Sequence, residues 1–247
     1  MMSMKFNNLF DMRQISVLSE RYLDVILGDI KNTLILFLQS PIIATLIVLA
    51  WKNTDADKTL YFVICLTAVW FGCINSCREI VKERPVYQRE VMVNLSTGSY
   101  VLSKMLVLGV LSFIQCLILL IIVDQYVGLP GNKLMLFISL FMCSLGGTSL
   151  GLLLSSVVGN EDKAVALVPL LIIPQILFSE ILIPSDLHQG ITVWIEKMML
   201  VKWGFEGMKQ ITAATINYGI IFQDICILFL FTITFLVISI ISMKISE

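Results

Sequence analysis

The sequence predicts an all-α integral membrane protein, with six transmembrane helices preceded by an interfacial amphipathic helix. Two observations predict this class. First, 57% of the 247 residues are hydrophobic and only 14% are charged, with a mean hydropathy of +0.91, whereas a soluble domain is about 45–50% apolar and about 25% charged. Second, six runs of roughly membrane-spanning length lack Lys, Arg, Asp and Glu. These runs are Leu34 to Trp51, Thr59 to Cys77, Met105 to Val123, Leu134 to Asn160, Ala164 to Ser179 and Ile225 to Met243.

Residues 12–33 are expected to form the amphipathic helix. Ile15, Leu18, Tyr22, Ile26 and Ile30 recur at steps of three and four, and the charged residues lie largely on the remaining faces. This pattern favours a helix in the membrane interface with its apolar side toward lipid. An ordinary amphipathic cytosolic helix is the alternative. The charges throughout this segment also argue against a cleaved signal peptide.

The charge distribution predicts which way the spans face. The spans are expected at about 34–51, 59–77, 103–124, 134–158, 164–183 and 221–243. Cytoplasmic loops near membrane spans are enriched in Lys and Arg. With these spans, eleven of the 17 Lys and Arg residues fall on the side of the two termini and six fall on the opposite side. Both termini are therefore expected in the cytoplasm.

The loop from Arg78 to Lys104 is the most charged part of the chain. Between Arg78 and Glu90, four cations alternate with three anions. This mixture favours a protein-docking surface over a lipid-binding patch, which would carry one sign of charge; a solvated loop is the alternative. Pro85 suits the first turn of a helix, so a short helix is expected over 83–92.

The second half of the chain contains two irregular features. Pro169 and Pro174 interrupt the fifth span, and either a bend that lines a pathway or a simple packing kink would account for them. Residues 184–218 are too long for a tight turn and rich in partly apolar residues. We expect this segment to pack on the outer face or re-enter the interface, with its tryptophans at headgroup depth.

The composition argues against several classes of function. A net charge of −1 gives no basic surface for nucleic acid. The six cysteines lie in or beside apolar runs without CxxC pairs, which is typical of core packing rather than disulfides or metal sites. His188 has no metal ligand or catalytic partner close in the sequence. A membrane enzyme is the least supported class, because no two ionisable residues sit together inside the expected spans.

Several motifs resemble those of a known family. The expected interfacial helix carries Arg13-Gln14 and Arg21, and it is followed by ERPVYQRE at 83–90, YVLSK at 100–104, FSEILIP at 178–184 and KWGFEG at 202–207. Their order and spacing resemble the membrane domain of type-2 ABC exporters, closest to the G subfamily that includes the white and pleiotropic-drug-resistance transporters. The resemblance covers nearly the whole chain.

The resemblance implies six spans in each of two halves, which pair as a homodimer or as a heterodimer with a second permease. It also implies that a short coupling helix after the second span rests on a cytosolic ABC ATPase. The coupling residues would be Glu83, Arg84, Tyr87, Arg89 and Glu90.

A substrate pathway is also implied, in a central cavity between the two halves that is lined by the second and fifth spans. Its residues would be Phe71, Val168, Ile172 and Gln175. Ile181 and Leu182 would form an apolar plug on the outer side, beside Glu180 where the family usually has glycine. Each of these residues also has a plain packing interpretation.

The chain contains no GxxxxGK[ST] phosphate loop, so ATP and magnesium are expected in a separate ATP-binding subunit and no cofactor is expected here. We therefore expect a non-enzymatic permease subunit in the inner or plasma membrane of a bacterium. It would export a hydrophobic or amphipathic substrate. Two alternatives stay open: a type-2 permease for lipid-linked polysaccharide, and a non-transporting immunity or sensor protein that docks an ATPase.

Overall fold

The computed structural model describes residues 10–52, 54, 56–183, 190–213 and 215–245, and all ten elements within these ranges are α-helices. Five helices are long and apolar enough to span a membrane. They are α2 (Ile30–Trp51), α3 (Lys58–Ser76), α5 (Thr97–Val127), α6 (Lys133–Val157) and α10 (Tyr218–Ile245). The remaining helices are α1 (Met12–Gly28), α4 (Arg84–Val91), α7 (Glu161–Leu177), α8 (Ile191–Lys197) and α9 (Leu200–Thr212).

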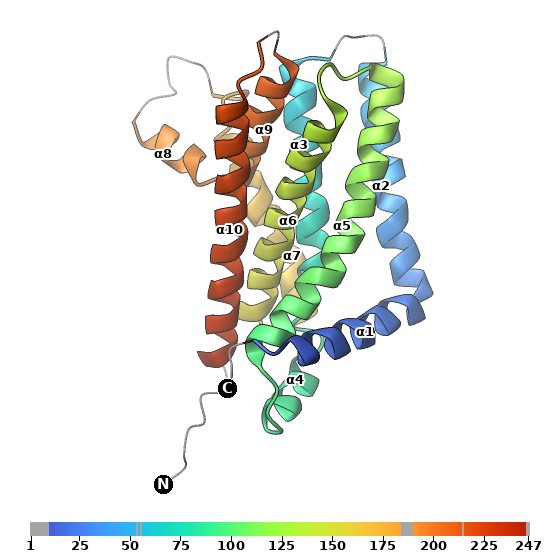
Figure 1. Cartoon of the computed structure of the whole chain (residues 1–247), viewed down its shortest axis with the longest axis vertical. Helices are drawn as coiled ribbons and strands as arrows, with labels where there is room; N and C mark the ends of the chain where they lie inside the picture. The colour runs from blue at the N-terminus through green and yellow to red at the C-terminus, as the bar shows by residue number, and fades with distance from the viewer. Residues whose placement is uncertain (1–9, 53, 55, 184–189, 214, 246–247) are drawn as a thin grey trace.

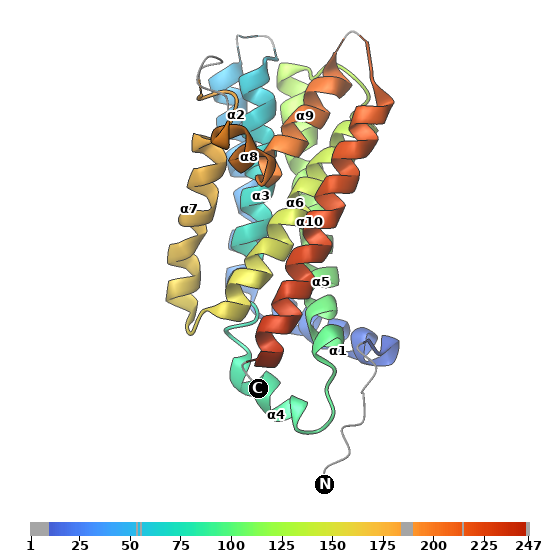
Figure 2. The same ribbon diagram turned by 90° about the vertical axis from the view of Figure 1, so that its left-hand side faces the viewer.

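The long helices stand side by side as an upright bundle (Figure 1). Helix α1 lies across one end of this bundle, and α4 lies beyond the bundle at the same end. Helices α8 and α9 lie toward the opposite end, and α7 runs along one edge (Figure 2). The bundle therefore has two distinct ends, one formed by α1 and α4 and the other by α8 and α9.

Polar side chains cap the first turn of several helices. The side chains of Asp11, Asp57, Asn132 and Asn160 each accept a hydrogen bond from a backbone N–H in the first turn of the following helix. These are the residue types preferred at helix N-caps. Gly128 ends α5 with a φ of 74°, a left-handed conformation that costs glycine little.

Two helix boundaries differ from the sequence-based expectation. Helix α5 begins at Thr97, six residues before the start of the expected span at 103, because the Ser96 side chain caps its first turn by accepting from the N–H of Ser99. Helix α7 ends at Leu177 rather than near 183. There the N–H and the hydroxyl of Ser179 both donate to the carbonyl of Ile176, so the chain turns.

The apolar stripe of α1 faces protein. Ile15, Leu18 and Tyr22 are buried, and the last two pack with residues of α5 in one hydrophobic cluster. Val17 and Leu27, on other sides of α1, are exposed. Lipid contact at the membrane interface would therefore fall to a different face of α1 than the sequence pattern predicts.

Helices α3 and α6 approach each other so closely that their backbones nearly touch. A Cβ added at Gly72 would lie 2.1 Å from the carbonyl oxygen of Ser144, and one added at Gly147 would lie 2.3 Å from that of Val69. At Gly151 a Cβ would lie 2.7 Å from a backbone oxygen of α3. Small residues permit this approach, and close packing is a main source of helix association in membranes.

Three amide side chains connect α2, α3 and α5, and those of Asn75 and Gln115 are buried. Gln39 donates to the side-chain oxygen of Asn75 at 2.9 Å, and Asn75 donates to that of Gln115 at 2.6 Å. Gln115 in turn donates to the carbonyl of Leu36 at 2.7 Å. Because hydrocarbon offers no partner for polar groups, this chain of hydrogen bonds holds the three helices together.

Among the described residues, no group of three or more His, Cys, Asp and Glu residues is placed to hold a metal ion. His188 lies outside the described residues. Five of the six cysteines are buried, and Cys226 is exposed on α10.

The α3–α6 contact gives a stability prediction. Gly147→Ala should lower the free energy of unfolding by about 1–3 kcal/mol, because the methyl group cannot fit against the backbone of α3 without moving it. The measurement is thermal unfolding of the purified protein in detergent. The matched control is Gly109→Ala, where the added Cβ meets only a side-chain carbon of Leu145, at 3.5 Å. Equal midpoints for the two variants would contradict the prediction.

Candidate functional site

A buried lysine lies at the end of the bundle that carries α4. Lys104 is 2% exposed, and its Nζ lies 2.6 Å from Oε2 of Glu83. The same ammonium group lies 3.5 Å from the centre of the Tyr22 ring of α1. The Tyr100 hydroxyl donates to the same Glu83 oxygen at 3.2 Å. These contacts join α1, α5 and the start of α4 through one ionic group, which we call the Lys104 cluster (Tyr22, Glu83, Tyr100 and Lys104).

Two further contacts hold α1 against the charged segment. Tyr22 donates its hydroxyl to Oε2 of Glu79 at 2.6 Å. Burial, and then the nearby Glu79 carboxylate, raise the pKa of Tyr22 well above its usual value, so the phenol keeps its proton and remains a donor. Arg21, next to Tyr22 on α1, pairs with Glu90 of α4 at 2.5 Å, and this hydrogen bond raises the pKa of Arg21.

The end of α6 orients the segment between α3 and α4. The backbone N–H groups of Ile80 and Val81 both donate to the Ser155 hydroxyl at 3.0 Å. The Arg84 guanidinium donates to the carbonyl of Ser156 at 2.5 Å. The position of α4 is therefore set by α1, α5 and α6 together.

Most of the expected coupling residues contact the rest of the chain. Glu83 and Glu90 accept from Lys104 and Arg21, and Arg84 bonds α6, as described above. Tyr87 is 3% exposed and donates to the Thr97 hydroxyl at 3.0 Å. Of the five residues, only Arg89 is exposed.

The exposed surface around α4 contains fewer charged residues than the docking surface expected from the sequence. We call it the α4 face, and its residues are Pro85, Gln88, Arg89, Met92 and Val93. Met92 and Val93 are 85% and 78% exposed. An exposed apolar pair beside a cation is typical of a protein contact.

The four expected pathway residues lie inside this chain. Phe71 of α3 and Val168, Ile172 and Gln175 of α7 are each at most 4% exposed. Gln175 accepts from the backbone N–H of Val201 at 3.2 Å. These four side chains are therefore covered by other parts of the same chain.

The expected plug residues follow α7 at the opposite end of the bundle. Leu182 is exposed, whereas Ile181 packs against the main core. Glu180 accepts from Lys209 of α9 at 2.7 Å, and Lys209 also pairs with Glu206 at 3.2 Å. The carboxylate at position 180 therefore has a cation on α9 that compensates it. Pro184, the last residue of this motif, lies outside the described residues.

The role of Lys104 is not predicted from the sequence, in which it closes the charged loop and Tyr22 belongs only to an apolar stripe. The available signal is a lysine inside the predicted span 103–124, because a charge there requires a partner. The sequence does not reveal which of the nearby carboxylates supplies that partner.

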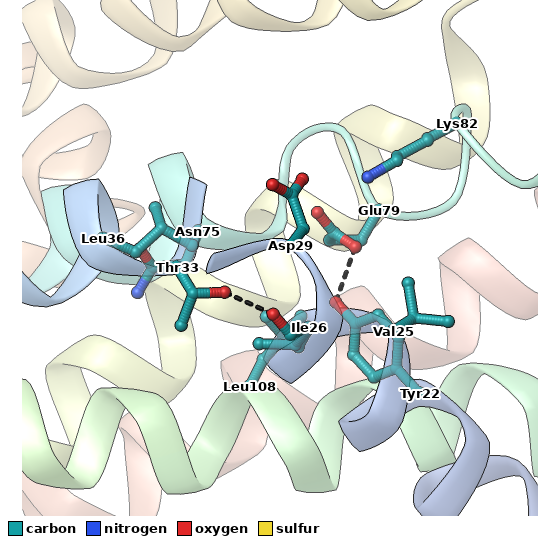
Figure 3. Close-up of a pocket in the computed structure, with 10 residues that line it drawn as sticks. All are labelled: Tyr22, Val25, Ile26, Asp29, Thr33, Leu36, Asn75, Glu79, Lys82 and Leu108. Atoms are coloured by element: carbon teal, nitrogen blue, oxygen red, sulfur yellow. Dashed lines mark hydrogen bonds between the residues drawn. The ribbon is translucent and has the colours of Figure 1, made fainter. Parts of the chain in front are cut away.

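A small cavity adjoins the Lys104 cluster (Figure 3). Its volume is about 20 Å³, enough for roughly one water molecule. Among its lining residues are Tyr22, Asp29, Asn75, Glu79 and Lys82. The cavity therefore extends from the polar contacts of α1 to the amide chain between α2, α3 and α5.

The Lys104 cluster gives a second stability prediction. Lys104→Met preserves much of the side-chain volume but leaves the Glu83 carboxylate without its cation. Breaking a buried pair costs about 3–5 kcal/mol, and we expect the lower end because Glu83 is 19% exposed. Denaturant unfolding in micelles measures the change. Adding Glu83→Gln should restore part of the loss, and the exposed-residue control Lys163→Met should leave stability unchanged. A wild-type midpoint for Lys104→Met would refute this role.

Comparison with known proteins agrees with this architecture. Residues 13–213 match the family described as ABC-2 type transporter. The ABC transporter ATP-binding/permease protein Rv1747 of Mycobacterium tuberculosis is 29% identical over 161 residues, which cover 61% of this chain. The chain spans 18% of the length of that relative.

The matched region runs from α1 through α9 and includes the Lys104 cluster, the α4 face and α7. Together with the five apolar helices, the match identifies a multi-pass membrane protein and a membrane component of a transporter. The chain belongs to the ABC-2 type transporter family.

Proposed function

We propose that this chain is the membrane subunit of an ATP-driven exporter and forms the pathway for a hydrophobic or amphipathic substrate. The α4 face carries this proposal. It presents two exposed apolar residues and Arg89 at the end of the bundle, in a chain of a transporter family. A rigidly held, partly apolar surface is suited to contact an ATPase.

We further propose that the ATPase is a separate polypeptide. The relative is named as both ATP-binding and permease, whereas these 247 residues contain no GxxxxGK[ST] phosphate loop. In this mechanism, ATP draws two ATPase subunits together and each pulls on one α4 face. The Lys104 cluster then passes the force to α1 and α5. ATP and magnesium belong to the partner subunit.

The proposed topology has six spans, with α7 as the sixth. Its 17 residues measure about 26 Å at 1.5 Å per residue, slightly less than the thickness of the hydrocarbon core. The turn that continues to Ile183 supplies the remaining depth. The excess of Lys and Arg at the α1 and α4 end supports cytoplasmic termini in the inner or plasma membrane. We propose that two such subunits pair, identical or different, as in the G subfamily that the motifs resemble.

The substrate would pass between α3 and α7. Phe71, Val168 and Ile172 offer apolar surface there, and Gln175 offers a single amide. This lining supports an apolar or amphipathic cargo. Ile181 and Leu182, with the Glu180–Lys209 pair beside them, would close the outer end.

The test of the docking surface uses co-expression with candidate ABC ATPases from the same genome. Arg89→Glu combined with Met92→Asp should reduce the co-purified ATPase at least tenfold, since both side chains are exposed and neither supports the fold. The control is Lys163→Glu, which is exposed at the same end of the bundle. Equal recovery with the double variant would place the ATPase elsewhere.

Transport is measured separately, as ATP-dependent movement of a fluorescent amphipathic dye in proteoliposomes that hold the complex. Dye movement that requires ATP supports the exporter. An ATPase that stays bound and active without moving any of a panel of such dyes would favour a non-transporting membrane component instead.

A further inference from the structure

A second, polar cleft opens beside the cavity at the Lys104 cluster. Its volume is about 210 Å³, and we call it the headgroup cleft, lined by Asp29, Arg78, Glu79, Lys82 and Glu161. Three of these residues, Asp29, Glu79 and Lys82, line both cavities. In Figure 3 the carboxylates of Asp29 and Glu79 and the ammonium group of Lys82 converge on a common space.

The cleft combines charges of both signs from three parts of the chain. Asp29 joins α1 to α2, Arg78, Glu79 and Lys82 follow α3, and Glu161 begins α7. Three of the five lining residues carry a carboxyl group, and the other two are Arg78 and Lys82. The volume would hold on the order of ten water molecules, which is far more than a single metal ion needs. A ligand with one anionic and one cationic group matches this set best.

The chemistry of the cleft selects a primary ammonium group over a quaternary one. Carboxylates accept hydrogen bonds from –NH₃⁺, whereas quaternary ammonium groups are bound by aromatic faces. The aromatic ring at the adjoining cavity is Tyr22, and the ammonium of Lys104 covers it at 3.5 Å. A choline group would therefore not find the Tyr22 face open.

The surroundings of the cleft are apolar and exposed. Leu27 and Ile30, on either side of Asp29, are 64% and 72% exposed, and Val25 is 45% exposed. Helix α1 lies across the end of the bundle, where the apolar helices begin (Figure 1). Polar groups with exposed apolar residues beside them are typical of the depth at which lipid headgroups lie.

We propose that the headgroup cleft binds the phosphoethanolamine headgroup of a membrane phospholipid. The phosphate lies beside Arg78 and Lys82, and the primary ammonium lies among the carboxylates of Asp29, Glu79 and Glu161. The acyl chains rest against the exposed apolar residues of α1 and α2. The bound lipid thereby links α7 to the α1–α2 junction. Assigning this lipid to the cytoplasmic leaflet rests on the proposed function, but the binding itself does not.

Thermal unfolding of the purified, delipidated chain in a mild detergent tests the site. Titration with dihexanoyl-phosphatidylethanolamine should raise the midpoint by several degrees and saturate, because the ligand binds the folded state. Dihexanoyl-phosphatidylcholine at the same concentrations should give no saturable shift. Equal half-saturation by the two lipids would overturn the proposal.

Charge-neutral variants locate the site. Glu161→Gln, in the exposed first turn of α7, and Arg78→Gln should each raise the half-saturating concentration at least tenfold. The matched control is Asp162→Asn, which is also exposed in that turn but does not line the cleft. If Glu161→Gln leaves the half-saturating lipid concentration unchanged, the proposed site is refuted. This conclusion holds even if Arg78→Gln impairs folding.

A further titration distinguishes the source of the ligand. Free phosphoethanolamine should bind much more weakly than the lipid, because it lacks the acyl contacts. Equal affinity would assign the cleft to a soluble ligand and overturn the lipid proposal. Because the assay needs neither ATPase nor transport, its result is independent of the test of function.

Discussion

The approach of α3 to α6 is the contact on which the rest of the structure depends. Gly72, Gly147 and Gly151 bring the two backbones so close that a single methyl group would collide with a carbonyl oxygen. Because apolar side chains gain nothing by leaving lipid for one another, membrane helices associate through such packing and through hydrogen bonds. The amide chain of Gln39, Asn75 and Gln115 then adds α2 and α5 to this pair.

This scaffold extends directly to the surface proposed to contact the ATPase. The last turn of α6 holds the segment after α3 through the Ser155 hydroxyl, which accepts from two consecutive backbone N–H groups. Lys104 then fixes Glu83 at the start of α4. A displacement at Met92, in the turn that follows α4, would therefore be passed to α1, α5 and α6 through these contacts.

The sequence predicts much of the fold but less of the candidate site. Charge-free runs and amphipathic periodicity are local features of the sequence, so they predict the helical membrane class. Pro85 is likewise a local signal, and it predicts the short helix that starts near it. Contacts between distant segments depend on tertiary packing. Neither the pairing of Lys104 with Glu83 nor the cation that Lys209 supplies to Glu180 has a local signal. The same limit explains why the stripe of α1 was assigned to lipid, although Leu18 and Tyr22 pack with α5.

The arrangement also indicates which helix can move. Helix α3 meets α6 through close backbone contacts, whereas α7 meets α3 through side chains such as Val168 and Ile172. Pro169 and Pro174 lie inside α7 and remove two backbone donors, so this helix bends more easily than its neighbours. Opening between α3 and α7 would therefore disrupt fewer rigid contacts than opening between α3 and α6. If the chain forms a pathway, we expect it on the side of α3 that faces α7, because the side that faces α6 is held by close backbone contacts.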